Sequence, residues 1–422
     1  MMLKTGTAEH VSSWAESRRA VRAPAESQRA LALHVAALLG FAVLYTVAFF
    51  QALEHHSGYM GNTFKAIHPE SFPGDQYVTG RQPTLMSFFY VAAHLVGEAW
   101  LDDRLHFVCY FGLACLAIFS VDRIIALMGV QDRLQRVAII ALLAIPHQFK
   151  DNLAMLVPAH NHSATTFISP LALLLALWLF RGHRTGATLA LSLFMVLLSV
   201  KNGWYPALVT LLFAVRERWH VRWRTIAEVV ALSLIGIFLI FCLTHLNDPM
   251  PALLFDHVVL WTEDSEANPF MELGIGNYLY GLLLAGAMLV RFPSPQLKER
   301  LRVFIVMACA MWLFGGFYYT FAPDAIKIAF LQSLAVNRST WWPQVLSYTV
   351  VACAAMTWLT QGTRRGRLWG AITLVALYLI PFFQNLSMRV SPVFLKRTAL
   401  WLFACGVSAG IVVLIRRIRP SF

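Results

Sequence analysis

Residues 31–51 read LALHVAALLGFAVLYTVAFFQ and form the centre of an apolar segment that covers residues 30–52. A helix of about 20 apolar residues is long enough to cross the hydrocarbon layer of a bilayer. The segment is too long and begins too late for a secretory signal peptide, and no small-residue cleavage site follows it. We therefore expect residues 30–52 to form a membrane-spanning helix.

The composition of the whole chain points to many such helices. Of the 422 residues, 58% are hydrophobic and only 13% are charged, whereas soluble domains are roughly 45–50% apolar and about 25% charged. The chain is therefore predicted to be an all-α polytopic membrane protein with about 12 transmembrane helices, in a range of about 10–13. The further predicted spans are 105–128, 137–147, 163–181, 186–200, 204–215, 225–246, 277–291, 303–321, 343–361, 368–384 and 398–415.

The net charge of +12 is explained by the orientation of these spans. Basic residues favour the cytoplasmic side of a membrane, and the arm before the first span is basic. With the arm inside, the inner segments hold 24 Lys and Arg and 8 Asp and Glu, and the outer segments hold 10 and 14, so the net charges are +16 and −4. This asymmetry predicts that both termini are cytoplasmic, and it leaves no charge that calls for a nucleic-acid partner, for which no motif spacing is present. The predicted organisation is a cytoplasmic basic arm, 1–29, and a single transmembrane domain, 30–422.

The longest predicted outer segment is the loop 53–104, and loops of this length are usually either functional or disordered. Its apolar stretch 84–98 is predicted to be a juxtamembrane helix lying in the outer interface. Ahead of it, residues 72–77 read FPGDQY, in which Pro-Gly makes a tight turn that presents Asp75 at its exit. From spacing alone, Asp75 is either a functional carboxylate or an ordinary residue of a solvated turn.

A second outer segment, 147–162, concentrates ionisable side chains: Lys150, Asp151, His160 and His162 are among them. A His-x-His pair beside an Asp can bind a divalent metal ion or donate N–H groups to a phosphate oxygen. The alternative is that these histidines make ordinary interfacial hydrogen bonds.

Two more outer segments carry cations. The segment Lys201-Asn202-Gly203-Trp204-Tyr205-Pro206 is predicted to connect two short apolar helices that form an outward-pointing hairpin. Lys201 then faces water, a cavity or an anion, or it snorkels to the interface. Arg338 lies just before Trp341-Trp342, at an interface where arginine is disfavoured by the inside bias. We therefore expect Arg338 to have an anionic partner. Three partners are considered: a substrate phosphate, a lipid headgroup and a loop carboxylate.

One charged pair lies inside a predicted span, and two common functional motifs are absent from the sequence. Asp122-Arg123, near the inner end of a span, predicts an ion pair within one helix or between two helices. The sequence contains no nucleotide-binding GxxxxGK[ST] loop and no HExxH motif.

The arrangement resembles the GT-C class of membrane glycosyltransferases, which use polyprenyl-phosphate-linked sugars. Three features carry the resemblance: FPGDQY in the first outer loop, the helix–short basic loop–helix pattern of 105–146, and LQSLAVNRSTWW at 331–342. The chain departs from the class in having a single Asp in place of an acidic pair and no large soluble C-terminal domain.

The resemblance implies a GT-C-like bundle in a bacterial inner membrane, with its active face outside. It implies Asp75 as the catalytic base and three cations that hold the donor phosphate, Lys150, Lys201 and Arg338. It also implies a polyprenyl-phosphate-linked sugar as donor, with the acceptor unspecified and a divalent metal at His160 and His162 left open. Arg81, Asp151, His160, His162 and Trp204 are the remaining candidates for the substrate site.

Two other functions are kept open by the sequence. One is a transporter or flippase of an anionic or lipid-linked substrate, against which the scarcity of acidic residues inside the spans counts. The other is a polymerase or ligase of surface polysaccharide, which would use the outer cations without a catalytic Asp.

Overall fold

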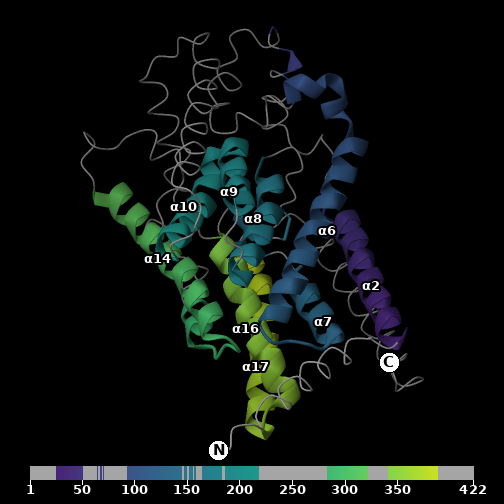
Figure 1. The fold of residues 1–422 in the computed structure, drawn as a ribbon, viewed down its shortest axis with the longest axis vertical. Coiled ribbons are helices and arrows are strands. Elements are labelled where there is room, and N and C mark those ends of the chain that lie inside the picture. The colour runs from purple at the N-terminus through teal and green to yellow at the C-terminus, as the bar shows by residue number, and fades with distance from the viewer. Residues whose placement is uncertain are drawn as a thin grey trace, which may run out of the picture.

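The structure, a computed structural model, describes about half of the chain, and that part is α-helical apart from one short β-hairpin (Figure 1). The all-α fold class predicted from the sequence is confirmed for this part. The described residues are 25–50, 64, 67–68, 70, 93–144, 147–149, 152–154, 156–157, 164–182, 186–217, 283–321 and 341–387.

Each long helix coincides with a predicted apolar segment. The helices are α2 (Ala25–Phe49), α6 (Asp103–Leu127), α7 (Arg133–Leu143), α8 (Ala164–Arg181), α9 (Gly186–Leu198), α10 (Val200–Arg216), α14 (Pro295–Phe321), α16 (Trp341–Gln361) and α17 (Arg364–Ser387). Residues 283–289 are also helical, within the predicted span 277–291. The predicted spans 225–246 and 398–415 lie outside the described residues.

Within the described part, two helices are long and apolar enough to cross a membrane, Ala30–Phe49 and Asp103–Leu127. The helices α8, α9 and α10 are apolar but shorter. The twelve-span bundle predicted from the sequence is therefore not established by the described helices.

Side-chain caps decide where α6 and α7 begin. The Asp102 carboxylate accepts the backbone N–H of Arg104 at 2.8 Å, and the Asp132 carboxylate accepts that of Leu134 at 2.8 Å. These bonds satisfy amide groups that have no partner inside the helix. A 3₁₀ turn, η3 (Gly97–Leu101), leads into α6 from the helical residues 93–96, whereas residues 84–92 of the predicted juxtamembrane helix lie outside the described residues.

The segment 201–206 corrects one prediction. It is not a connection between two helices, because it lies inside α10, and the turn falls at Ser199, whose φ of −159° and ψ of 110° are extended. The two helices do form a hairpin, and Gly203 makes its tight tip possible: a Cβ there would lie 2.1 Å from the carbonyl oxygen of Met195.

A second difference is the hairpin of β1 (His147–Phe149) and β2 (Asn152–Ala154), which pair antiparallel with Phe149 opposite Asn152. No strand was predicted in the segment 147–162. Strands of three residues are too short for a period-two pattern to be recognised.

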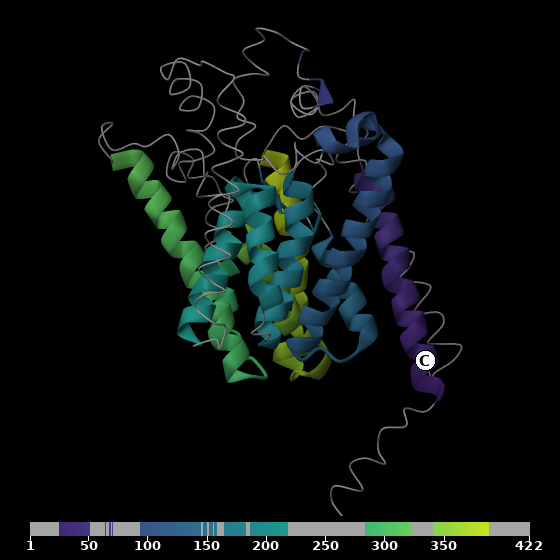
Figure 2. The same ribbon diagram turned by 45° about the horizontal axis from the view of Figure 1, so that its top comes forward.

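The helices alternate in direction, so that one end of the bundle gathers the connections that were predicted to be cytoplasmic (Figure 2). Arg300, in the first turns of α14, reaches the carbonyl oxygen of Phe180 at the end of α8 and the carboxylate of Glu217 just after α10. Gly129, after α6, lies beside Pro293, before α14. We call this end of the bundle the basic end and the opposite end, which carries the β-hairpin, the hairpin end.

The described charges are divided unequally between the two ends. The basic end holds thirteen Lys and Arg and five Asp and Glu, and the hairpin end holds two and four. The basic residues of the first group are Arg29, Arg123, Arg133, Arg136, Arg181, Arg216, Arg291, Lys298, Arg300, Arg302, Arg364, Arg365 and Arg367; its acidic residues are Glu26, Asp122, Asp132, Glu217 and Glu299.

The buried apolar side chains form one continuous core, but many other apolar side chains are exposed on the surface of the helices. Tyr45 and Tyr110 both donate their hydroxyl to the carbonyl oxygen of Val157, at 2.9 and 3.1 Å, which ties α2 and α6 together at the hairpin end. On α17, an exposed apolar face recurs at helical spacing, formed by Leu368, Trp369, Ile372, Val375, Tyr378 and Leu379.

Candidate functional site

Most of the predicted site lies outside the described residues. Asp75, Arg81, Lys150, Asp151, His160, His162 and Arg338 belong to this group, so their mutual distances stay a prediction. Lys201 lies in the first turn of α10, and Trp204 is the one predicted site residue whose side chain is described.

Trp204 lies one turn inside α10, close to the hairpin end. Its ring meets Tyr205 edge to face, with centroids 6.0 Å apart and planes at 84°. Its Nε1–H is buried and has no hydrogen-bond partner among the described residues. Within the described part of the chain, Trp204 therefore keeps a free N–H donor close to the hairpin end.

An aromatic contact joins α10 to α16 at the same level. The rings of Tyr205 and Trp342 meet edge to face, with centroids 6.0 Å apart, and Trp342 is only 1% exposed. Tyr205 follows Lys201 by four residues, and Trp342 follows Arg338 by four. Lys201 and Arg338, two of the three predicted phosphate-binding cations, thus each precede one of the two contacting rings by four residues.

The β-hairpin brings the third cation to the same elements. β2 packs against α16, and β1 packs against α17. Lys150 and Asp151 are the two residues between these strands in the sequence. α10 and β2, which hold or adjoin Lys201 and Lys150, therefore both contact α16, the helix that begins three residues after Arg338.

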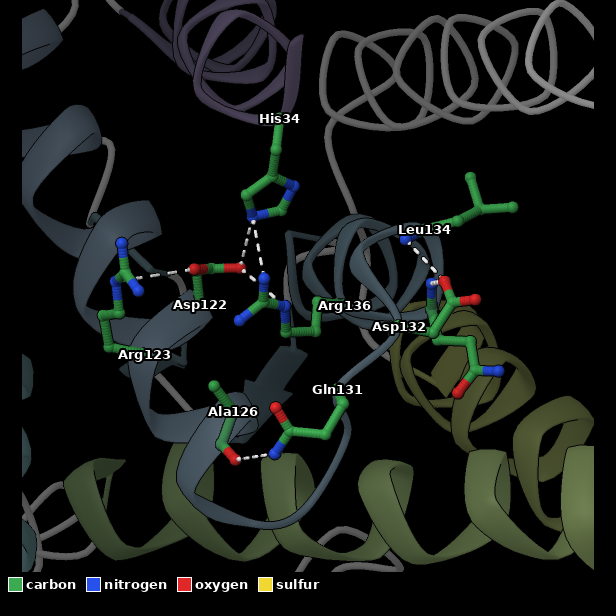
Figure 3. A network of polar contacts seen from close by, with 9 residues as sticks. His34, Asp122, Arg123, Ala126, Gln131, Asp132, Leu134 and Arg136 are labelled. Atoms are coloured by element: carbon green, nitrogen blue, oxygen red, sulfur yellow. Dashed lines mark hydrogen bonds and ion pairs between the residues drawn. The ribbon is translucent and has the colours of Figure 1, made fainter. Parts of the chain in front are cut away.

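A buried ionisable cluster lies toward the basic end, between α2, α6 and α7 (Figure 3). The Nε2 of His34 is 2.9 Å from Oδ1 of Asp122, and an N–H at that position donates to the carboxylate. Arg136 places its Nε 3.4 Å from the same oxygen and its Nη2 3.4 Å from Nε2 of His34. Asp122 is 1% exposed and Arg136 is 7% exposed, so the pair lies away from water.

Further charges surround this cluster. Arg123 lies next to Asp122 in α6, with its Nε 3.9 Å from Oδ2, and is about half exposed. Oδ2 of Asp122 and Nη1 of Arg133 are buried and have no hydrogen-bond partner among the described residues. The predicted Asp122 ion pair is therefore chiefly between helices, through Arg136.

His34 and Arg136 were not singled out in the sequence. Arg136 was counted only as a residue of an inner loop, and His34 lies within an apolar span. The one available signal was an ionisable residue inside such a span, since these residues are rare there and are usually paired. Spacing could not identify the partners, because His34 and Asp122 are 88 residues apart.

A second charged cluster ties three helices together at the basic end. Arg300 donates two parallel bonds to Glu217, at 2.9 and 3.2 Å, and a third to the carbonyl oxygen of Phe180 at 3.1 Å. Beside it, Arg216 donates to Glu299 at 2.5 Å. That hydrogen bond lowers the pKa of the Glu299 carboxyl, and the positive charges of Arg216 and Arg302 act in the same direction. Every cation here has a carboxylate partner nearby, which suits a structural junction.

The described residues contain no group of three or more His, Cys, Asp or Glu that could hold a metal ion. The predicted metal candidates, His160 and His162, lie outside the part of the chain to which that finding applies. A metal ion at the predicted site is therefore neither supported nor opposed by the described geometry.

Comparisons with known proteins found no match to this chain. No family model matches its sequence, and no curated protein or solved structure matches it. The function must therefore be argued from the residues and their arrangement.

Proposed function

We propose that the chain is an integral-membrane glycosyltransferase, GT-C-like in architecture, that moves a sugar from a polyprenyl phosphate to an acceptor on the outer face. The observation that carries this proposal is the meeting of α10, α16 and the β-hairpin, whose neighbouring residues supply Lys201, Arg338 and Lys150. The proposed reaction is taken from the resemblance to GT-C enzymes. The proposed membrane orientation follows from the excess of basic residues at the basic end.

The exposed apolar surface supports a bilayer as the surroundings. Val47 of α2 is 62% exposed, Val108 of α6 is 64% exposed and Val375 of α17 is 56% exposed. On α17 the exposed apolar residues recur at helical spacing. Extended apolar faces are uncommon on monomers in water, whereas lipid solvates them. In the proposed architecture of about 12 spans, the basic end faces the cytoplasm and the hairpin end faces outward.

The proposed reaction assigns each residue one task. Asp75 accepts the proton of the acceptor hydroxyl, whose oxygen attacks the anomeric carbon of the sugar. The bond between that carbon and the phosphate oxygen breaks, and the polyprenyl phosphate leaves with the electron pair. Lys150, Lys201 and Arg338 stabilise the charge that develops on the leaving phosphate. Trp204, together with the other predicted substrate-site residues, contacts the sugar.

The test is transfer of labelled sugar from a panel of polyprenyl-phosphate donors in membranes that contain the full chain. Asp75→Asn should lower transfer by about 10²-fold or more, because general-base catalysis contributes at least that factor. Glu70→Gln is the matched control, since it removes a carboxylate from the same outer loop at a well-exposed position. Wild-type transfer by an Asp75→Asn protein present in normal amount would remove Asp75 from the mechanism.

A second candidate function is a transporter or flippase of an anionic or lipid-linked substrate. The specific observation in its favour is the buried His34–Asp122–Arg136 cluster, because paired ionisable residues inside a membrane often mark proton or ion pathways. A flipping assay in proteoliposomes, using a fluorescent lipid-linked sugar, separates the two candidates. Transport predicts that Asp122→Asn abolishes flipping and Asp75→Asn leaves it intact.

A polymerase or ligase of surface polysaccharide is distinguished in the same transfer assay. It predicts that Arg338→Gln abolishes transfer while Asp75→Asn does not. Loss of transfer in both variants supports the glycosyltransferase.

A further inference from the structure

A cleft opens at the basic end, on the side of the bundle away from the predicted site. Its volume is about 590 Å³, within the range of about 300–1,000 Å³ that is usual for pockets holding small organic ligands. Three elements line it: the turn after α6, the segment 289–293 before α14, and the second half of α16.

The side chains that line the cleft are apolar except for those of Arg291 and Thr357. Arg291 is the single charged residue of the lining, and it has no ion-pair partner among the described residues. The hydroxyl of Thr357 is already used, because it donates to the carbonyl oxygen of Cys353 at 2.9 Å. Among the described residues, the cleft thus offers one cation without an ion-pair partner and no carboxylate to oppose an anion.

The apolar part of the cleft is open to its surroundings. Leu289 is 82% exposed and Trp358 is 45% exposed. Trp favours the boundary between lipid tails and headgroups, where its ring is apolar and its N–H is wet. An apolar wall that ends in a Trp and an Arg at the basic end matches the chemistry of a lipid chain below a phosphate.

We propose that this cleft binds an anionic phospholipid of the inner leaflet, with its phosphate at Arg291 and an acyl chain along Leu289 and Trp358. The charge complementarity favours an anionic lipid over a neutral one, because the thirteen basic and five acidic described residues of this end leave it strongly positive. The inference rests on the membrane orientation proposed above and is independent of the glycosyl-transfer chemistry.

The experiment uses the full chain in nanodiscs of phosphatidylcholine with a small fraction of phosphatidylglycerol, and native mass spectrometry counts the lipids retained. Arg291→Gln should lower the affinity for phosphatidylglycerol roughly fivefold, the effect of one basic residue near a lipid surface. Ala354→Phe, which fills the cleft from α16, should lower retention of phosphatidylglycerol as well. Arg365→Gln is the matched control, because Arg365 lies at the same end in α17 and does not line the cleft.

Each remaining outcome overturns a definite part of the proposal. An equal effect of Arg365→Gln and Arg291→Gln would mean diffuse attraction of anionic lipid, without a site. Displacement by inorganic phosphate, with no effect of Ala354→Phe, would identify a free-anion site in place of a lipid site. A wild-type protein that enters nanodiscs without selecting phosphatidylglycerol refutes the lipid site alone, whereas one that does not enter them refutes the membrane orientation.

Discussion

At the scale of single residues, the Asp122 carboxylate decides the energetics of the buried cluster. Asp122→Ala leaves Arg136, which is 7% exposed, without its carboxylate partner. Removing one partner of a buried ion pair costs about 3–5 kcal/mol, and we expect a loss of stability of that order. Chemical unfolding of the purified protein in detergent micelles measures it.

A double-mutant cycle shows whether this cost comes from the pair itself. Replacing Asp122 and Arg136 together by apolar residues should destabilise the protein less than the sum of the two single changes, because no buried charge is left alone. Arg123→Gln is the control: Arg123 is about half exposed and 3.9 Å from the carboxylate, and such pairs contribute about 0–1 kcal/mol. Additive single effects in the cycle would contradict an interaction between Asp122 and Arg136.

Glu299 gives the basic end a dependence on pH. Its pKa is lowered from the ordinary value of 4.5 by the hydrogen bond from Arg216, so the native state binds a proton less readily than the unfolded state. The stabilisation is therefore complete above pH 4.5 and is lost as the pH falls through the lower native pKa. Unfolding midpoints measured over this range should fall with acid in the wild type, and Glu299→Gln should remove part of the fall. Parallel curves for the two proteins would show that the pair contributes nothing.

At the scale of elements, the end of α8 depends on a glycine. Gly182 has a φ of +75°, and a Cβ there would lie 2.9 Å from Nη1 of Arg300. Gly182→Ala should therefore cost about 1–2 kcal/mol from the left-handed backbone alone, with some further loss if the Arg300 guanidinium moves. Thermal unfolding compares it with Gly186→Ala, at the start of α9, where a Cβ would meet nothing within 4 Å. Equal unfolding midpoints for the two variants would contradict the constraint on Gly182.

The elements that could be predicted are those marked by the composition of a single short stretch of sequence. The apolar lengths gave the positions of α2, α6 and α8, because hydrophobicity over a window reports burial in protein or lipid. The start of α14 was placed at residue 303, whereas the helix begins at Pro295, because the charged stretch after Pro295 lacks the apolar signal yet consists of good helix formers. The turn at Ser199 was misplaced for a different reason. Gly203 suggested a loop, but its lack of a side chain serves the close approach to Met195.

The parts that could not be predicted depend on contacts between distant segments. Asp122 was identified as a member of an ion pair, but its partners lie on α2 and α7, and helix packing alone brings them together. The same holds for the predicted site. Lys201 and Arg338 were chosen one by one from the sequence. The contact of Tyr205 in α10 with Trp342 in α16 was not foreseen, because the two residues are far apart in the chain.

At the scale of the whole molecule, the charge asymmetry links the sequence to the arrangement of the helices. The prediction of inner and outer segments used only the order of the spans and the positive-inside rule. In the structure, α6, α8, α10 and α16 all finish at the basic end, so the segments assigned to the inside do lie together. The remaining question is whether a membrane separates this end from the hairpin end.

Cysteine labelling in intact cells answers it. In a background without the native cysteines, Glu98→Cys at the hairpin end should react with a membrane-impermeant thiol reagent. Thr363→Cys, between α16 and α17 at the basic end, should react only after the membrane is permeabilised, because the bilayer then no longer shields the cytoplasmic side. Glu98 is well exposed, and residue 363 is exposed as well, so burial in the protein does not explain a difference between them. Labelling of both positions in intact cells would refute the transmembrane arrangement, and labelling of Thr363→Cys alone would reverse it and move the predicted site to the cytoplasmic face.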